Sequence, residues 1–187
     1  FGVPPLMVTP ELRRRAKAVN FGIVYGLSAF GLAAQLGIPR TEAQTYIDGY
    51  FARYAGVRRF IDETIAEVRR TGATSTLFGR ERPIPDMDSR NPNARGFAER
   101  TAVNTPLQGT AADLIKLAMI RIDAALGARG LGTAMLLQVH DELLFESPPE
   151  ELDEIRKLVK SEMESVAKLE VPLIADVGIG DNWRDAK

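Results

Sequence analysis

The chain of 187 residues is long enough to bury one sizeable hydrophobic core or two small ones. Its hydrophobic content of 45% and charged content of 26% are ordinary for a globular protein. No apolar run approaches the roughly 18 residues of a membrane helix, and no signal-peptide pattern is present. The sequence contains no cysteine. The absence of cysteine excludes disulfides and thiolate metal sites and favours a reducing, cytoplasmic setting. The absence of a long apolar run predicts no membrane partner.

The net charge of −1 conceals an asymmetry along the chain. Residues 1–105 carry 15 Lys or Arg against 10 Asp or Glu, a balance of +5. Residues 106–187 carry 9 against 15, a balance of −6. This division is compatible with a polyanion-binding part joined to a metal-binding carboxylate site. It is equally compatible with two solvated surfaces of opposite sign.

The first part of the chain has the pattern of successive helices. Thr9 is suited to an N-cap and Pro10 to the first helical position, so a helix is expected to run to about Tyr25, with Gly26 as its stop. Gly72 is expected to end the helical array. The further helices are expected over residues 31–36, 40–53 and 57–70.

The second part mixes strands and helices. Residues 74–78 resemble a short strand, followed by a loop to about Asn93 and by helical stretches over 94–104 and 107–126, interrupted at Pro106. Residues 135–146 predict two apolar strands that meet at a His140-Asp141 turn. Ser147 and Glu150 form a capping box for a helix over 149–167, and 172–179 are expected to be a last strand. The whole predicts an α+β fold.

The first helix carries four cations within Arg13–Lys17, close to its N-terminus, where the helix dipole disfavours positive charge. Arg13, Lys17, Phe21 and Tyr25 recur every four residues and form a ridge about 18 Å long, cationic at one end and aromatic at the other. Such a ridge suits a nucleoside polyphosphate, with cations for the phosphates and a flat ring for sugar or base. The alternative is a solvated basic turn followed by aromatic residues of the core.

The predicted hairpin places Asp141 at its tip and Glu142 beside it. A carboxylate exposed at a rigid turn can bind a divalent cation without being buried unpaired. The alternatives are that Asp141 serves only the turn, and that His140, the one histidine, is a satisfied half-buried residue.

Two motifs together resemble the family A DNA polymerases, the DNA polymerase I family. Val139-His140-Asp141-Glu142 resembles the family's second metal-binding motif, which carries a catalytic aspartate on a hairpin of the palm. The first helix resembles the R-x₃-K-x₂-N-F-G-x₂-Y-G signature of the fingers helix through Arg13, Lys17, Asn20, Phe21, Gly22, Tyr25 and Gly26.

The resemblance implies roles for the first helix and a division of the chain. Arg13 and Lys17 would bind the triphosphate, with Lys17 also catalytic, while Phe21 would stack beside the deoxyribose and Tyr25 would lie near the nascent base pair. Residues 1–84 would form the fingers subdomain and 85–187 the C-terminal part of the palm. Of the two remaining cations, Arg14 is expected to face DNA or solvent, and Arg15 to be simply solvated.

At the hairpin, the resemblance makes Asp141 and Glu142 catalytic residues and ligands of two Mg²⁺ ions. His140 would support the primer terminus. The other DNA-binding residues it implies are Arg14, Gly26, Arg100, Asn104 and Gln108. The implied partners are primer–template DNA, a dNTP and the upstream palm and thumb of the same polymerase, in a bacterial cytoplasm.

The family's first catalytic aspartate, in a D-x-S-x₂-E-L-R motif, is missing. Asp86–Arg90 has only a superficial likeness to it and lies in a predicted loop. Since the sequence also begins without methionine, we expect a fragment that is inactive alone. The alternatives are a fragment of a single-subunit, phage-type RNA polymerase and a non-catalytic nucleic-acid-binding module. A small metal hydrolase is disfavoured because one histidine gives too few ligands.

Overall fold

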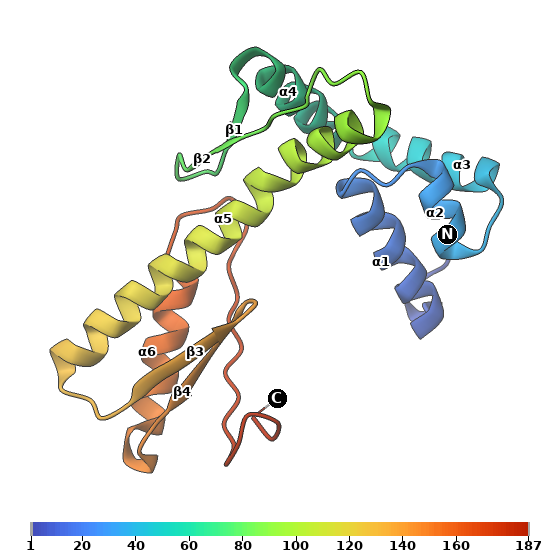
Figure 1. Ribbon diagram of the computed structural model, residues 1–187. Coiled ribbons are helices and arrows are strands. Elements are labelled where there is room, and N and C mark those ends of the chain that lie inside the picture. Colours follow the sequence, from blue (N-terminus) through green and yellow to red (C-terminus); the bar gives the residue numbers. More distant parts are fainter. Residues whose placement is uncertain (1, 187) are drawn as a thin grey trace. The chain divides into compact units, whose positions relative to one another are not determined.

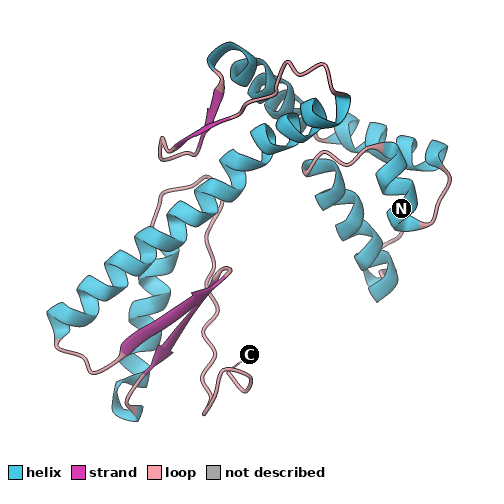
Figure 2. Cartoon of the chain, viewed as in Figure 1, coloured by secondary structure: helices cyan, strands magenta, loops and turns pink. Residues whose placement is uncertain are grey.

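The computed structural model describes residues 2–186, which form two compact units. The first unit ends at Gly109 and the second begins at Thr110, within the long helix α5 (Pro92–Arg129) (Figure 1). Figure 2 shows that helices dominate and that the strands form two separate short hairpins. In the described part of the chain, no helix is both long enough and apolar enough to cross a membrane.

The first unit consists mainly of helices connected by short turns. A 3₁₀ turn and one small antiparallel hairpin, in which Ala73 pairs with Pro83, complete it before α5. Its elements before α5 are η1 (Pro5–Met7), α1 (Pro10–Val24), α2 (Ala29–Leu36), α3 (Arg40–Arg53), α4 (Ala55–Thr71), β1 (Ala73–Ser75) and β2 (Glu81–Pro83).

The predicted helix boundaries in this unit are confirmed to within a few residues, because the capping residues act as expected. The Thr9 hydroxyl accepts a hydrogen bond from the Leu12 N–H at 3.2 Å, and Pro10 is the first helical residue of α1. Gly26 follows α1 with a φ of 78°, and Gly72 caps α4 with a φ of 79°. Glycine reaches this left-handed conformation without the steric cost that a Cβ adds.

Two apolar clusters hold the first unit together. The first joins α2 and α3 through Leu32 and Ala43, both fully buried, with Val19 of α1 packed against them. The second contains Val68 of α4, Ile84 and Met87 of the following loop, and Ala98 and Ala102 of α5.

The interruption predicted at Pro106 is wrong, since α5 runs unbroken from Pro92 to Arg129. A proline in a helix interior removes the N–H that would bond to the carbonyl four residues earlier, here that of Ala102. The hydroxyl of Thr74 in β1 donates to the Ala102 carbonyl oxygen at 3.3 Å, and both residues are buried. The strand thus supplies the donor that the proline lacks.

The second unit packs a hairpin and a helix against the C-terminal half of α5. Strands β3 (Ala134–Val139) and β4 (Glu142–Glu146) pair antiparallel around the predicted His140-Asp141 turn, with a register shift between Met135 and Leu137. The chain then forms η2 (Pro149–Glu151) and α6 (Leu152–Glu164).

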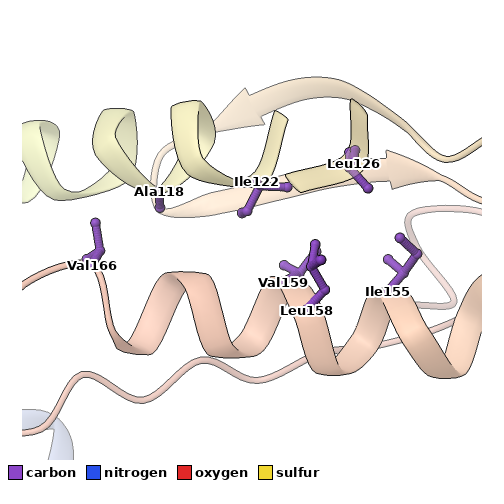
Figure 3. Close-up of a cluster of buried hydrophobic side chains, with 7 residues drawn as sticks. All are labelled: Ala118, Ile122, Leu126, Ile155, Leu158, Val159 and Val166. Carbon is purple, nitrogen blue, oxygen red and sulfur yellow. The ribbon is translucent and has the colours of Figure 1, made fainter. Parts of the chain in front are cut away.

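The core of this unit lies between α5 and α6 (Figure 3). Fully burying a side chain of the size of Ile or Leu stabilises a fold by about 1.5–3 kcal/mol, so the facing apolar stripes of the two helices hold the unit together. The cluster comprises Ala118, Ile122, Leu126, Ile155, Leu158, Val159 and Val166.

Two further expectations for this unit are wrong. Ser147 does not cap a helix, because its Oγ bonds to Thr133 Oγ1 at 2.8 Å, and the helix begins only after η2. The strand expected over 172–179 does not form among the described residues: the Ala175 N–H bonds to the Glu164 carboxylate at 3.0 Å instead of a neighbouring strand.

The α+β fold class is confirmed, with helices first and an antiparallel hairpin packed on helices afterwards. The structural units divide at 109/110, whereas the expected subdomains divide at 84/85. Residues 85–109 pack with the first unit because Met87, Ala98 and Ala102 share a core with Val68 of α4. The assignment of 1–84 to fingers and 85–187 to palm remains a prediction.

Candidate functional site

The first unit contains an open pocket of about 620 Å³ beside α1. This volume is in the range of small-molecule sites, which are typically about 300–1,000 Å³. Residues from α1, from the turn between α1 and α2, from the C-terminal end of α2 and from α5 line it. They are Arg14, Lys17, Ala18, Phe21, Gly22, Tyr25, Gly26, Leu27, Ser28, Gln35 and Arg100.

The predicted ridge of α1 contributes its aromatic end and one cation to this pocket. Lys17, Phe21 and Tyr25 all line it, and the two rings are stacked with centroids 6.2 Å apart and planes 14° apart. Both rings are exposed, Phe21 by 52% and Tyr25 by 40%. The alternative in which these aromatics belong to the core is therefore wrong.

The pocket is lined by Arg14 and not by Arg13, whereas the sequence placed Arg13 on the phosphate-binding ridge and Arg14 towards DNA or solvent. Arg13 is exposed but does not line the pocket, whereas Arg14 does and also pairs with Glu11 at 2.7 Å. Among residues 2–186, neither Arg13 nor Lys17 has an ion-pair partner. An anion in the pocket would therefore meet the charge of Lys17 without first displacing an internal carboxylate.

Arg15 is not simply solvated, which corrects the expectation for this residue. It is half-buried, on the side of α1 that faces Tyr46 of α3. Burial raises the pKa of the Tyr46 hydroxyl, and the positive charge of Arg15 opposes that shift. Arg15 is thus partly packed within the first unit and is not among the residues that line the pocket.

Gly26 and Arg100 meet at one edge of the pocket. A Cβ on Gly26 would lie 3.0 Å from Arg100 Cγ, and the Gly26 φ of 78° is already unfavourable for other residues. The stem of Arg100 therefore packs over the glycine backbone beside Tyr25. This contact brings a third cation to the pocket from α5, 74 residues along the chain from Gly26.

The hairpin of the second unit presents the other candidate residues at its tip. His140, Asp141 and Glu142 are all exposed, and His140 has a positive φ of 55°. Gln138 Nε2 donates to the His140 carbonyl oxygen at 2.7 Å, which braces the turn. His140 is therefore exposed, and the alternative of a half-buried histidine is wrong.

The carboxylates at this tip fit part of a divalent-cation site. Asp141 and Glu142 offer the oxygen ligands that Mg²⁺ prefers, and they are exposed rather than buried without a counter-charge. In the described part of the chain, no three Asp, Glu or His side chains gather closely enough to hold a metal. The hairpin can therefore supply some ligands of a metal pair and not a complete set.

Comparison with known proteins identifies the family. The profile described as DNA polymerase family A matches residues 1–185. DNA polymerase I of Streptococcus pneumoniae R6 is 56% identical over 188 residues, which cover 100% of this chain and 21% of that protein. DNA polymerase I of Bacillus subtilis is 51% identical over 180 residues, covering 96% of this chain and 20% of that protein. This chain belongs to DNA polymerase family A.

A solved family A structure has the same fold. The polymerase domain of M. smegmatis Pol1, described as a complex with DNA primer-template and dNTP, matches with a TM-score of 0.96 and 49% identity. The match covers 100% of this chain and 33% of that one. The chain thus spans about one fifth of the curated relatives named above and one third of this solved chain.

The DNA-binding residues implied by the family lie at spacings of four on α5. Arg100 and Gln108 are exposed, and Asn104 is half-buried with its Oδ1 lacking a hydrogen-bond partner within the described residues. At i, i+4 and i+8 they lie along one side of the helix. Their contacts with DNA, like those of Arg14, Gly26 and His140, remain predictions.

The sequence reasoning missed contributors that only packing brings to these sites. Ser28 and Gln35 line the pocket because α2 folds back beside α1. Trp183, near the C-terminus, donates from its indole N–H to Glu142 Oε2 at 3.3 Å. Nothing in the local sequence around Trp183 signals this partner 41 positions earlier.

Proposed function

We propose that this chain is part of a DNA-directed DNA polymerase and carries its nucleotide-binding helix and one of its metal-binding motifs. The complete enzyme would transfer a nucleotide from a dNTP to the 3′-hydroxyl of a primer paired with a template. The observation that carries the proposal is the pocket in which Lys17, the stacked Phe21 and Tyr25, and Arg100 converge. Family membership and the DNA and dNTP named for the M. smegmatis Pol1 complex support it.

In the proposed mechanism the first unit binds and orients the nucleotide. Lys17 offers an ammonium to the phosphates, and Arg13 adds charge one turn closer to the helix N-terminus, where N–H groups also favour anions. The exposed face of Phe21 offers a flat surface to the sugar, and Tyr25 continues that surface towards Gly26. Together these groups fix the triphosphate relative to the base, which is the main task of a phosphoryl-transfer site.

The second unit would hold metal ions through the hairpin tip. Asp141 and Glu142 are the residues that would bind them, on a two-stranded frame that fixes the turn. Two Mg²⁺ ions, when bound, would activate the primer hydroxyl and stabilise the leaving pyrophosphate. His140, next to these carboxylates, would contact the primer terminus.

Because the hairpin offers only two carboxylates, we propose that the 187 residues by themselves do not catalyse nucleotide addition. The remaining ligands and the other DNA contacts would come from the upstream palm and thumb of the same polymerase. Primer extension above background by the purified 187-residue chain would overturn this part of the proposal. We also propose a bacterial cytoplasm as the setting, since the relatives named above come from bacteria.

The first test replaces Lys17 with Ala in the full-length polymerase that contains this chain. Loss of a charged group aimed at the transferring phosphates is expected to slow single-turnover dNTP addition by about 10²–10³-fold. Binding of primer–template DNA should change little. The matched control is Lys157→Ala, which removes another exposed lysine, on α6. An unchanged rate with Lys17→Ala would contradict the nucleotide-binding assignment.

The second test separates a polymerase from a non-catalytic DNA-binding module. Asp141→Ala in the full-length protein should abolish nucleotide addition and leave DNA affinity largely intact, whereas Asp153→Ala, on the exposed face of α6, should alter neither. A binding module would be indifferent to Asp141→Ala and to Mg²⁺, and its affinity would fall steeply with salt. Competition between dNTP and rNTP tests the RNA polymerase alternative, which the DNA polymerase relatives already disfavour.

A further inference from the structure

The C-terminal residues of the second unit form a tight turn over 182–186. The Asn182 carbonyl oxygen accepts hydrogen bonds from the N–H groups of Asp185 and Ala186, each at 3.1 Å. The two side chains close the turn further, since Asn182 Oδ1 accepts from the Asp185 N–H at 3.2 Å and Asn182 Nδ2 donates to the Asp185 carboxylate. The segment therefore has a defined local structure of its own.

Two glycines let this turn fold back onto the preceding segment. A Cβ on Gly180 would lie 2.7 Å from the Asp185 carbonyl carbon, and one on Gly178 would collide with the Ala186 carbonyl oxygen. Real Cβ atoms do not approach backbone so closely, so glycine is required at both positions for this path. The absence of a side chain at Gly178 and Gly180 thus permits the close approach of residues 185 and 186.

The turn carries Trp183, whose indole N–H donates to Glu142 Oε2 at 3.3 Å. Figure 1 shows the red C-terminal segment passing beside the β3–β4 hairpin, in the same unit. We propose that Trp183 is a positioning residue that orients the Glu142 carboxylate for cation binding. This inference rests on the role proposed above for Glu142.

The chemistry of the two groups supports such a role. A glutamate at an exposed hairpin tip has three rotatable bonds and would otherwise sample many orientations. The indole nitrogen is a donor only, and its bond to an ionised carboxylate is charge-assisted. A carboxylate has about four lone-pair sites, so one such bond restricts its orientation and leaves the group able to bind a cation.

The test uses Trp183→Phe in the full-length polymerase, because phenylalanine keeps an aromatic ring and removes the N–H. Loss of a group that orients a metal ligand typically costs about 10–100-fold in metal affinity or activity. We expect about a tenfold increase in the Mg²⁺ concentration needed for half-maximal single-turnover addition, because the bond is long. Asn182→Ala, which opens the turn, should produce a similar shift. Lys157→Ala, an exposed lysine of α6, is the control and should leave the Mg²⁺ dependence unchanged.

A second readout does not depend on activity. Trp183 is the one tryptophan of the chain, so its emission in the full-length protein is the difference between wild-type and Trp183→Phe spectra. The same difference, taken between Glu142→Ala and the double variant Glu142→Ala, Trp183→Phe, should give a different spectrum. An unchanged spectrum would mean that the indole does not contact Glu142 in solution, and would overturn the inference.

The double variant Trp183→Phe, Glu142→Ala separates positioning from a merely structural effect. If Trp183 acts through Glu142, the double variant should match Glu142→Ala alone, whereas independent effects would multiply. The positioning role would be overturned, and the proposed function left standing, by either of two results. One is that the effects of the two changes on the Mg²⁺ dependence multiply. The other is that Trp183→Phe leaves this dependence unchanged although Glu142→Ala shifts it. A silent Glu142→Ala would instead overturn the metal-binding role of Glu142, and the positioning role with it.

Discussion

The hydrogen bond that lets α5 continue past Pro106 provides a sharp test of the fold. In Thr74→Val the side chain keeps its shape and loses its hydroxyl, so the buried Ala102 carbonyl loses the donor that lies 3.3 Å away. A buried polar group left without a partner costs about 1–3 kcal/mol. At about 1.4 kcal/mol per tenfold change, the local opening equilibrium of α5 should rise about 5- to 140-fold.

The companion change is Pro106→Ala, which restores an N–H four residues after Ala102. In that background the Ala102 carbonyl has a helical donor, so Thr74→Val should cost much less than in the wild type. The two changes should therefore be coupled by about 1–2 kcal/mol. This cycle isolates the hydrogen bond, because any loss of packing at position 74 is common to both backgrounds.

The assay is amide hydrogen exchange of the full-length polymerase, followed by mass spectrometry of peptides covering residues 98–110. It reports local opening and does not require two-state unfolding of a multidomain protein. Peptides from α6 in the second unit serve as an internal control and should be unaffected. If Thr74→Val increased exchange equally in the wild type and in the Pro106→Ala background, the explanation given for the unbroken helix would be refuted.

Three further predictions concern single positions. Gly26→Ala should destabilise the first unit more than Gly72→Ala in thermal unfolding: both glycines have a φ near 79°, but only a Cβ on Gly26 meets Arg100. Ile122→Ala, at a fully buried site, should lower the stability of the second unit by about 2–5 kcal/mol in denaturant titrations. Hydrogen bonds from the Thr133 hydroxyl and from backbone N–H groups lower the pKa of Glu151 in the folded protein. The ionised carboxylate therefore stabilises the fold above its unfolded pKa near 4.5, and this stabilisation is lost as the pH falls through the lower folded pKa. Glu151→Gln should therefore destabilise the start of β3 at about pH 7, measured by hydrogen exchange, and this difference should shrink towards about pH 3.

The sequence predicted most of the helices because their signals are local. Thr9 and Pro10 cap α1, and Gly26 and Gly72 supply the left-handed residues that end α1 and α4. The hairpin tip at His140-Asp141 was predicted from two short apolar runs meeting at a polar pair. In each case the residues that decide the structure lie within a few positions of the feature.

The wrong predictions share a physical cause, which is a partner distant in sequence. Thr74 supplies the donor that keeps α5 unbroken at Pro106, 32 positions later. Thr133 binds Ser147, so the expected capping box does not form, and Glu164 binds the Ala175 backbone where a strand was expected. Local propensity cannot anticipate a competing hydrogen bond that arises only when two elements pack.

The candidate sites divide along the same line. The sequence by itself determined the family motifs, the four-residue spacing of Lys17, Phe21 and Tyr25 on one helix face, and the carboxylate at a hairpin tip, because helix and strand periodicity place neighbours predictably. Only the tertiary structure decided that Arg100 packs over Gly26 at the pocket edge and that Trp183 bonds to Glu142. These contacts join positions 74 and 41 residues apart, and the periodicity of a single helix or strand carries no information about partners so distant along the chain.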